Sequence, residues 1–103
     1  MIRHKYGAIR CESEGIKFPS LLERNYYDKL KMMVKSKAIV MFLRQPKFDI
    51  GGGVSYSADF LIFENDGTCR VVDCKGMLTK DFIMKKKIVE SLYPIEIEVV
   101  RKA

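Results

Sequence analysis

The chain has 103 residues, 48% of them hydrophobic, and its 19 Lys and Arg against 13 Asp and Glu give a formal net charge of +6. This length suits one small domain with a packed core, and no apolar run approaches the ~20 residues of a membrane span. The basic N-terminal residues lack the apolar segment of a secretory signal, and the excess of positive charge favours a polyanionic partner, most simply nucleic acid.

The cysteine and histidine content argues against several kinds of site. Cys11, Cys69 and Cys74 are an odd number without a CxxC or paired Cys/His spacing, which favours a reducing cytoplasm over a disulfide framework or a structural zinc site. The single histidine, His4, lies in the N-terminal segment, so histidine-based triads and His-rich metal sites are effectively excluded.

Residues 1–18 are expected to form a basic N-terminal arm that precedes a single domain over residues 19–103. The arm lacks a clean hydrophobic period and is interrupted by Gly7 and Gly15, and its basic residues are Arg3, Lys5, Arg10 and Lys17. We therefore expect no regular core element before residue 19.

A helix is expected to follow, because Ser20 and Glu23 have the S-x-x-E spacing of a capping box. Apolar side chains then recur at helical spacing, so this helix is expected to reach Lys35. Residues 38–43 form a short apolar run that predicts a buried strand. Residues 47–54 contain three consecutive glycines and predict a flexible connection; no GK[ST] follows them, which argues against a phosphate-binding loop.

Two further elements close the chain. Thr79 can cap a helix that extends to about Leu92, where Pro94 stops it. Its expected core residues are Phe82, Ile83, Ile88, Val89 and Leu92. Residues 95–100 alternate between apolar and acidic side chains and predict a final strand with one solvated face.

Residues 56–76 read as two apolar strands joined by a polar turn, with Asp59, Asp73 and Lys75 where strands usually carry apolar side chains. A three-residue turn with Gly67 in the left-handed conformation would place Asp59 directly opposite Asp73, with Lys75 on the same face. Two carboxylates with Cβ atoms about 4.5–5.5 Å apart repel each other, and a divalent cation between them removes the repulsion. Hard oxygen ligands suit Mg²⁺ or Mn²⁺.

Two alternatives stay open for this hairpin. A two-residue Asp66-Gly67 loop would shift the register by one residue. Asp59 could also form a cross-strand salt bridge with Lys75 and leave Asp73 at a solvated edge. The apolar flanks of both strands argue against a solvated face.

Asp59 followed by Asp73-Cys74-Lys75, in a hairpin preceded by a helix that carries Glu23, resembles the PD-(D/E)xK nuclease superfamily. The order helix-strand-strand-strand-helix-strand is similar to its restriction-endonuclease-like core, a mixed α/β fold with a central mixed four-stranded sheet. The segments GIKFPSLLE, QPKF, YSADF and VVDCKG resemble a family of small phage and prophage endonucleases, and the arrangement is similar to phage endonuclease I, a Holliday-junction resolvase. The likeness covers roughly residues 5–100. It departs at Ala58, where the superfamily has Pro, and at Asp73, where Glu is commoner.

The resemblance implies a Mg²⁺-dependent DNA endonuclease in which Mn²⁺ substitutes for Mg²⁺. Carried over by position, Glu23, Asp59 and Asp73 would bind the metal and Lys75 would be the catalytic lysine, although Glu23 is also explained as a helix cap. Gln45 matches a polar position beside such sites. The basic residues expected to contact DNA, unless they form solvated surface, are Lys80, Lys85, Lys86, Lys87, Arg3, Lys5 and Arg10.

The most specific expectation is a homodimeric, structure-selective nuclease encoded by a phage or prophage, which acts on branched DNA in the bacterial cytoplasm. Such a dimer can make paired cuts in a four-way junction. No small-molecule cofactor or membrane is expected. The alternatives are a nicking or end-processing nuclease within a phage replication or packaging complex, and a non-catalytic DNA-binding module on the same fold.

Overall fold

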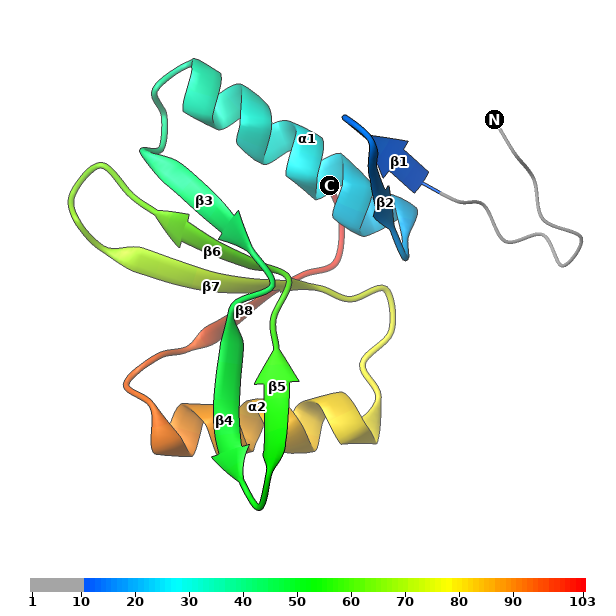
Figure 1. The fold of residues 1–103 in the computed structure, drawn as a ribbon, viewed down its shortest axis with the longest axis vertical. Coiled ribbons are helices and arrows are strands. Elements are labelled where there is room, and N and C mark those ends of the chain that lie inside the picture. Colours follow the sequence, from blue (N-terminus) through cyan, green and yellow to red (C-terminus); the bar gives the residue numbers. More distant parts are fainter. Residues whose placement is uncertain (1–10) are drawn as a thin grey trace, which may run out of the picture.

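The computed structural model describes residues 11–103, in which two helices cover opposite faces of a four-stranded mixed sheet (Figure 1). The strand order is β3-β6-β7-β8, and only the β7–β8 pair is parallel. The four strands are β3 (Met41–Arg44), β6 (Phe60–Phe63), β7 (Cys69–Cys74) and β8 (Ile97–Val100). The expectation of a mixed α and β fold with a four-stranded sheet is confirmed.

Helix α1 (Leu21–Lys35) begins where the sequence predicts. The Ser20 side chain accepts a hydrogen bond from the Glu23 N–H at 3.1 Å, which satisfies one of the free amides of the first turn. Tyr26, Tyr27 and Leu30 pack against Phe60, Ile62, Val72 and Cys74 of the sheet. This packing forms the first of two hydrophobic clusters.

The structure differs from expectation at the N-terminal segment. Residues 11–18 form a hairpin of β1 (Cys11–Ser13) and β2 (Ile16–Phe18) that packs on α1. Its turn has Glu14 and Gly15 at positive φ, and Phe18 is buried in the first cluster. Short three-residue strands leave little hydrophobic period to detect, which is why the sequence pattern does not reveal them.

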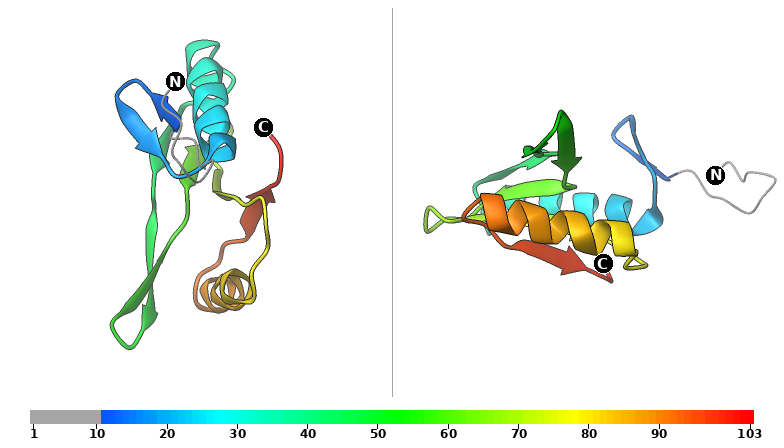
Figure 2. Two further views of the ribbon diagram at one scale, coloured as in Figure 1. Left: turned by 90° about the vertical axis from the view of Figure 1, so that its right-hand side faces the viewer. Right: turned by 90° about the horizontal axis from the view of Figure 1, so that it is seen from below.

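The expected flexible connection over residues 47–54 is wrong, because β4 (Lys47–Gly51) and β5 (Val54–Ser57) form a second hairpin. Phe48, Ile50 and Tyr56 contribute to the second hydrophobic cluster, on the α2 side of the sheet. The Tyr93 hydroxyl donates to the Asp49 carbonyl at 2.6 Å and ties the hairpin to the residue after α2. Figure 2 shows the β4–β5 hairpin beside α2. The three glycines make only the hairpin tip, while the alternating residues on both sides make strands.

This hairpin and the β3–β6 pair are one antiparallel ribbon with a bend. Arg44 pairs with Phe60 before the bend and Lys47 with Ser57 after it, so the register is continuous. Between them, the Gln45 N–H donates to the Asp59 carbonyl at 2.9 Å and the Ala58 N–H to the Pro46 carbonyl at 3.0 Å. Gln45 has φ +55°, an unusual conformation for a non-glycine residue, and it marks the corner. The strand predicted to begin at Tyr56 therefore belongs to two elements, β5 and β6.

The β6–β7 hairpin has the predicted register. Phe63 pairs with Cys69 and Phe60 with Val72, so extension by one residue places Asp59 opposite Asp73. Gly67 has φ +89°, and the Glu64 N–H donates to the Thr68 carbonyl at 2.8 Å. The Asp66 side chain accepts from the Thr68 N–H at 2.9 Å and completes the turn.

We expect Gly67→Ala to lower the free energy of unfolding by about 1–2 kcal/mol, because an L-residue resists the left-handed conformation. The added methyl group meets no atom within 4 Å, so the cost is purely conformational. Chemical denaturation should reveal it. Gly76→Ala, at a glycine whose φ is not positive and whose Cβ also meets nothing, is the matched control and should not destabilise the fold comparably.

Helix α2 (Lys80–Leu92) and β8 follow the predicted order. The Thr79 hydroxyl accepts from the Phe82 N–H at 3.1 Å, as its capping role predicts. Phe82 and Val89 are buried, but the expected burial of Ile83 and Leu92 is wrong, since their side chains are 40% and 55% exposed. Phe82 and Val89 lie on one side of α2, in the second cluster, whereas Ile83 and Leu92 lie about 100° and 80° around the helix from Phe82, on either side of it. No helix within residues 11–103 is long and apolar enough to cross a bilayer.

Candidate active site

The bend of the ribbon lies beside the C-terminal end of β7 and the first turn of α1. It brings together charged groups from four elements or their ends: Glu23 of α1, Arg44 of β3, Asp59 before β6, and Asp73 of β7. Lys75 follows β7 directly, held by its N–H, which donates to the Val100 carbonyl at 2.9 Å.

Asp59 replaces part of the β-ladder with its own side chain. Its Oδ2 accepts a hydrogen bond from the Cys74 N–H at 2.7 Å, and its backbone N–H donates to the Val72 carbonyl at 3.1 Å. A regular strand would offer a backbone carbonyl to Cys74, but the chain turns away at Ala58 toward β5. The carboxylate is thereby fixed against the backbone of β7 and remains half-buried.

Asp73 is a buried carboxylate whose oxygens have no hydrogen-bond partner in the described part of the chain. The residue is 1% exposed. Burial raises its pKa from 3.8 to about 6, while the charge of Lys75 and the Asp59 backbone amide, already bonded to Val72, oppose the rise only in part. Buried charges are costly unless paired, and residues 11–103 provide no hydrogen-bond partner for this carboxylate.

Glu23 is the second buried acid, at 4% exposure. Burial and the neighbouring Asp59 carboxylate raise its pKa from 4.5 to about 7, against the lowering effect of Arg44. Its Oε2 lies 3.6 Å from Arg44 Nη2 and has no hydrogen-bond partner within the described residues. Glu23 is thus more than a structural cap, because its backbone N–H makes the capping bond and its side chain faces the charged site.

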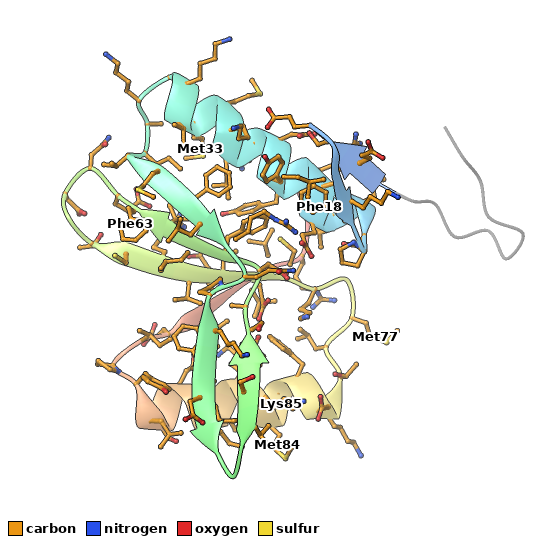
Figure 3. The ribbon with its side chains drawn as sticks, in the orientation of Figure 1. Phe18, Met33, Phe63, Met77, Met84 and Lys85 are labelled. Atoms are coloured by element: carbon orange, nitrogen blue, oxygen red, sulfur yellow. The ribbon has the colours of Figure 1, made fainter. Side chains whose placement is uncertain are left out.

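Arg44 is a site residue that the sequence analysis missed. Its guanidinium carbon stacks 4.6 Å from the centroid of the Phe18 ring, which lies beside α1 (Figure 3). The stacking and the contact with Glu23 hold the guanidinium at the bend. The available signal was the single cation at the end of an otherwise apolar strand, directly before Gln45-Pro46.

Lys75 lies on the Asp73 side of the site. Its Nζ is 5.1 Å from the centroid of the Phe82 ring, and its charge lowers the pKa of Asp73. This cation–π contact orients the ammonium without neutralising it. An Asp59–Lys75 salt bridge, the alternative left open for the hairpin, is absent among the ion pairs of residues 11–103.

The Cys74 thiol is buried at the end of β7, between Asp73 and Lys75 in the sequence. Burial raises its pKa from 9.0 to about 12, with further increases from Asp59, Glu23 and Asp73 and a decrease from Lys75. At neutral pH this thiol is protonated, so Cys74 is a packing residue and not a nucleophile.

The donor chemistry suits a hard divalent cation, although residues 11–103 contain no preformed group of three His, Cys, Asp or Glu side chains able to hold a metal ion. Three buried carboxylate oxygens without partners, two on Asp73 and one on Glu23, are the observation that fits a cation. Asp59 would complete an all-oxygen donor set next to Asp73. Cation binding would require the side chains of Glu23, Asp59 and Asp73 to move closer together.

The other predicted DNA contacts are dispersed. Lys85 and Lys86 form ion pairs with Asp81 and Glu90 at 3.1 and 2.9 Å, on α2 (Figure 3). Lys80 and Lys87 are exposed on the same helix and form no ion pair within the described residues. Gln45 is exposed at the bend, beside Asp59. Arg3, Lys5 and Arg10, with the rest of the predicted arm before residue 11, lie outside the described residues.

Comparison with known families identifies the family of the chain but no chemical activity. The family described as a protein of unknown function, DUF1064, matches residues 3–102, nearly the whole chain. No curated protein matches.

Proposed function

The chain belongs to this family of proteins of unknown function, and from the geometry of its site we propose that it is a metal-dependent endonuclease that hydrolyses phosphodiester bonds in DNA. The observation that carries the proposal is the buried, unpartnered Asp73 carboxylate opposite Asp59 and two residues before Lys75. Perturbed titratable groups gathered in this way are typical of functional sites.

The strand order and the helix that carries Glu23 support a PD-(D/E)xK-type core for this chain. Two carboxylates on adjacent antiparallel strands, a lysine beyond the second one and a glutamate from the preceding helix are the elements of that resemblance. Their arrangement about the end of β7 is the reason to favour catalysis over a binding module that merely retains the fold.

In this proposal, Asp73 and Asp59 hold the cation and Glu23 binds it directly or through water. When bound, Mg²⁺ or Mn²⁺ polarises a phosphate oxygen and lowers the pKa of a bound water. Lys75, two residues beyond Asp73, would stabilise the negative charge that develops on the phosphate. Its ammonium lies 5.1 Å from the centroid of the Phe82 ring, which orients it.

The described residues 11–103 hold one small sheet domain and no separate helix-turn-helix reader, which favours recognition of DNA shape over sequence. We therefore propose structure-selective cleavage by a homodimer, as in Holliday-junction resolution, within phage DNA processing in the bacterial cytoplasm. A nicking or end-processing nuclease remains the second candidate. Preference for a four-way junction over duplex separates the two.

The experiment is cleavage of a labelled four-way junction, a nicked duplex and a linear duplex with Mg²⁺ or Mn²⁺. Symmetrical cuts in the junction support a resolvase, while metal-dependent cuts without junction preference support the second candidate. DNA binding without any metal-dependent cleavage would contradict the nuclease proposal and favour the binding module.

We expect Lys75→Met to lower the single-turnover cleavage rate by roughly a hundredfold, the usual effect of removing one group that stabilises transition-state charge. Methionine keeps an unbranched apolar side chain of similar length to the lysine stem while removing the ammonium. Lys29→Met, at an exposed position of α1, is the matched control and should cleave at the wild-type rate. An equal rate in the two variants would remove Lys75 from the mechanism.

A further inference from the structure

A groove of about 630 Å³ lies between α1 and β3 and leads toward the candidate active site. Strand β3 runs back along α1 (Figure 1), so Met41 lies near the end of the helix and Arg44 near its start, where it meets Glu23. Tyr27 and Phe42 stack edge to face at 5.6 Å between the two elements. The groove is therefore lined by two aromatic rings and reaches Arg44, which contacts the buried Glu23 of the candidate active site at 3.6 Å.

Three cations line this groove at regular positions. Lys31 and Lys35 are one helical turn apart on the same side of α1, and Arg44 lies at the other end of the groove, where it contacts Glu23. The two lysines are about 6 Å apart along the helix axis, because each residue advances 1.5 Å. Among the described residues that line the groove, Glu14 is the one acid.

The contacts that Lys31, Lys35 and Arg44 make within residues 11–103 leave their side-chain N–H groups able to bind an anion. Lys31 pairs with Glu14 at 3.4 Å, but both side chains are about half exposed, so the pair contributes little and can open. Lys35 is exposed and forms no ion pair within residues 11–103. Arg44 contacts Glu23 at 3.6 Å, longer than a hydrogen bond, and its buried Nε has no partner in the described part of the chain.

The other large groove provides a contrast. It has a volume of about 710 Å³ and lies between the β4–β5 hairpin, β7 and the residues around β8. Its arginine, Arg70, is already bound to Glu64 and Glu98 at 2.6 and 2.9 Å, and Glu96 adds a further negative charge. Lys47 and Arg70 against Glu96 and Glu98 leave the lining of this second groove without net positive charge. Among the described residues, three cations and one acid line the groove between α1 and β3, which is therefore better suited to a polyanion.

We propose that the groove between α1 and β3 binds the phosphate backbone of one DNA strand and leads it to the active site. Lys35 and Lys31 contact phosphates along the groove, and Arg44, a planar donor that can hold two oxygens of one phosphate, contacts the phosphate nearest the metal position. The inference rests on the proposed nuclease function and adds the path of the substrate.

The test is the salt dependence of binding to a labelled four-way junction in EDTA, where no cleavage occurs. Lys31→Gln with Lys35→Gln should reduce the slope of log K against log salt by nearly 2, since each phosphate contact to duplex contributes about 0.9. Lys17→Gln with Lys29→Gln removes the same charge at exposed positions outside the groove and should leave the slope near that of the wild type. Thermal melting verifies that both pairs fold.

An equal reduction of the salt slope in both double variants would mean that only overall charge matters and would overturn the proposal. If the Lys31→Gln, Lys35→Gln variant keeps the wild-type slope but no longer dimerises in sedimentation, the groove binds a second copy of the chain, and the proposal is overturned as well. Cleavage by the wild type in Mg²⁺ is scored separately. If the wild type cleaves DNA but the Lys31→Gln, Lys35→Gln variant keeps the wild-type slope, only the proposed role of the groove is refuted. If the slope falls in this variant but the wild type never cleaves DNA, only the nuclease function is refuted.

Discussion

Asp73→Asn is expected to abolish metal-dependent cleavage and at the same time to stabilise the metal-free protein. The rate should fall by about a thousandfold or more, since a Lewis-acid metal supplies several kcal/mol and each 1.36 kcal/mol is tenfold in rate. The free energy of unfolding at pH 7.5 should rise by about 1–2 kcal/mol, because a raised pKa measures the cost of the buried charge. The amide also lacks a partner, which limits the gain.

The opposite signs of these two effects make Asp73→Asn informative. A purely structural carboxylate would lose stability on substitution, whereas a carboxylate kept buried for function gains it. Asp81→Asn is the matched control, since Asp81 is exposed and Lys85 is its ion-pair partner within residues 11–103. It should retain cleavage and change stability by no more than about 0.5 kcal/mol. Wild-type cleavage by Asp73→Asn, or a loss of stability at pH 7.5, contradicts the proposed role.

The part of the site that sequence alone predicted depends on local chemistry. A glycine at the third position of a tight turn fixes how β6 and β7 pair, and the pairing then fixes which side chains face each other. This is why Asp59 could be placed opposite Asp73 by counting from Gly67. The caps of α1 and α2 at Ser20 and Thr79 were predictable for the same reason, since each depends on residues within one helical turn.

The rest of the site depends on contacts between distant segments. The bend at Gln45 arises where two strands turn together, and neither strand alone carries a signal for it apart from Pro46. Arg44 reaches Glu23 only because β3 runs back along α1. The exposure of Ile83 likewise depends on how much of α2 the second cluster covers, which is the side of Phe82 and Val89, and the helical period does not reveal this extent.

The metal-free protein should become less stable as the pH rises from about 5 to 8. The pKa values of Asp73 and Glu23 in the folded state, about 6 and about 7, lie above their ordinary values of 3.8 and 4.5. The folded state therefore binds more protons than the unfolded state across this range, and its stability falls as these protons are lost. Lys75 lowers the pKa of Asp73 and Arg44 lowers that of Glu23, while Asp59 raises that of Glu23, and both pKa values remain above their ordinary values.

Mg²⁺ should reverse this loss at pH 7.5, because a cation that binds only the folded protein stabilises it by about 2.7 kcal/mol at a hundred times its dissociation constant. Urea unfolding at pH 5, 6, 7 and 8, with and without Mg²⁺, measures both effects. The double variant Glu23→Gln and Asp73→Asn should show a flatter pH profile and no stabilisation by Mg²⁺. If instead the wild type gains stability with rising pH, or Mg²⁺ stabilises the double variant equally, the two buried acids are not the metal site. Cleavage, if present, would then require another set of ligands.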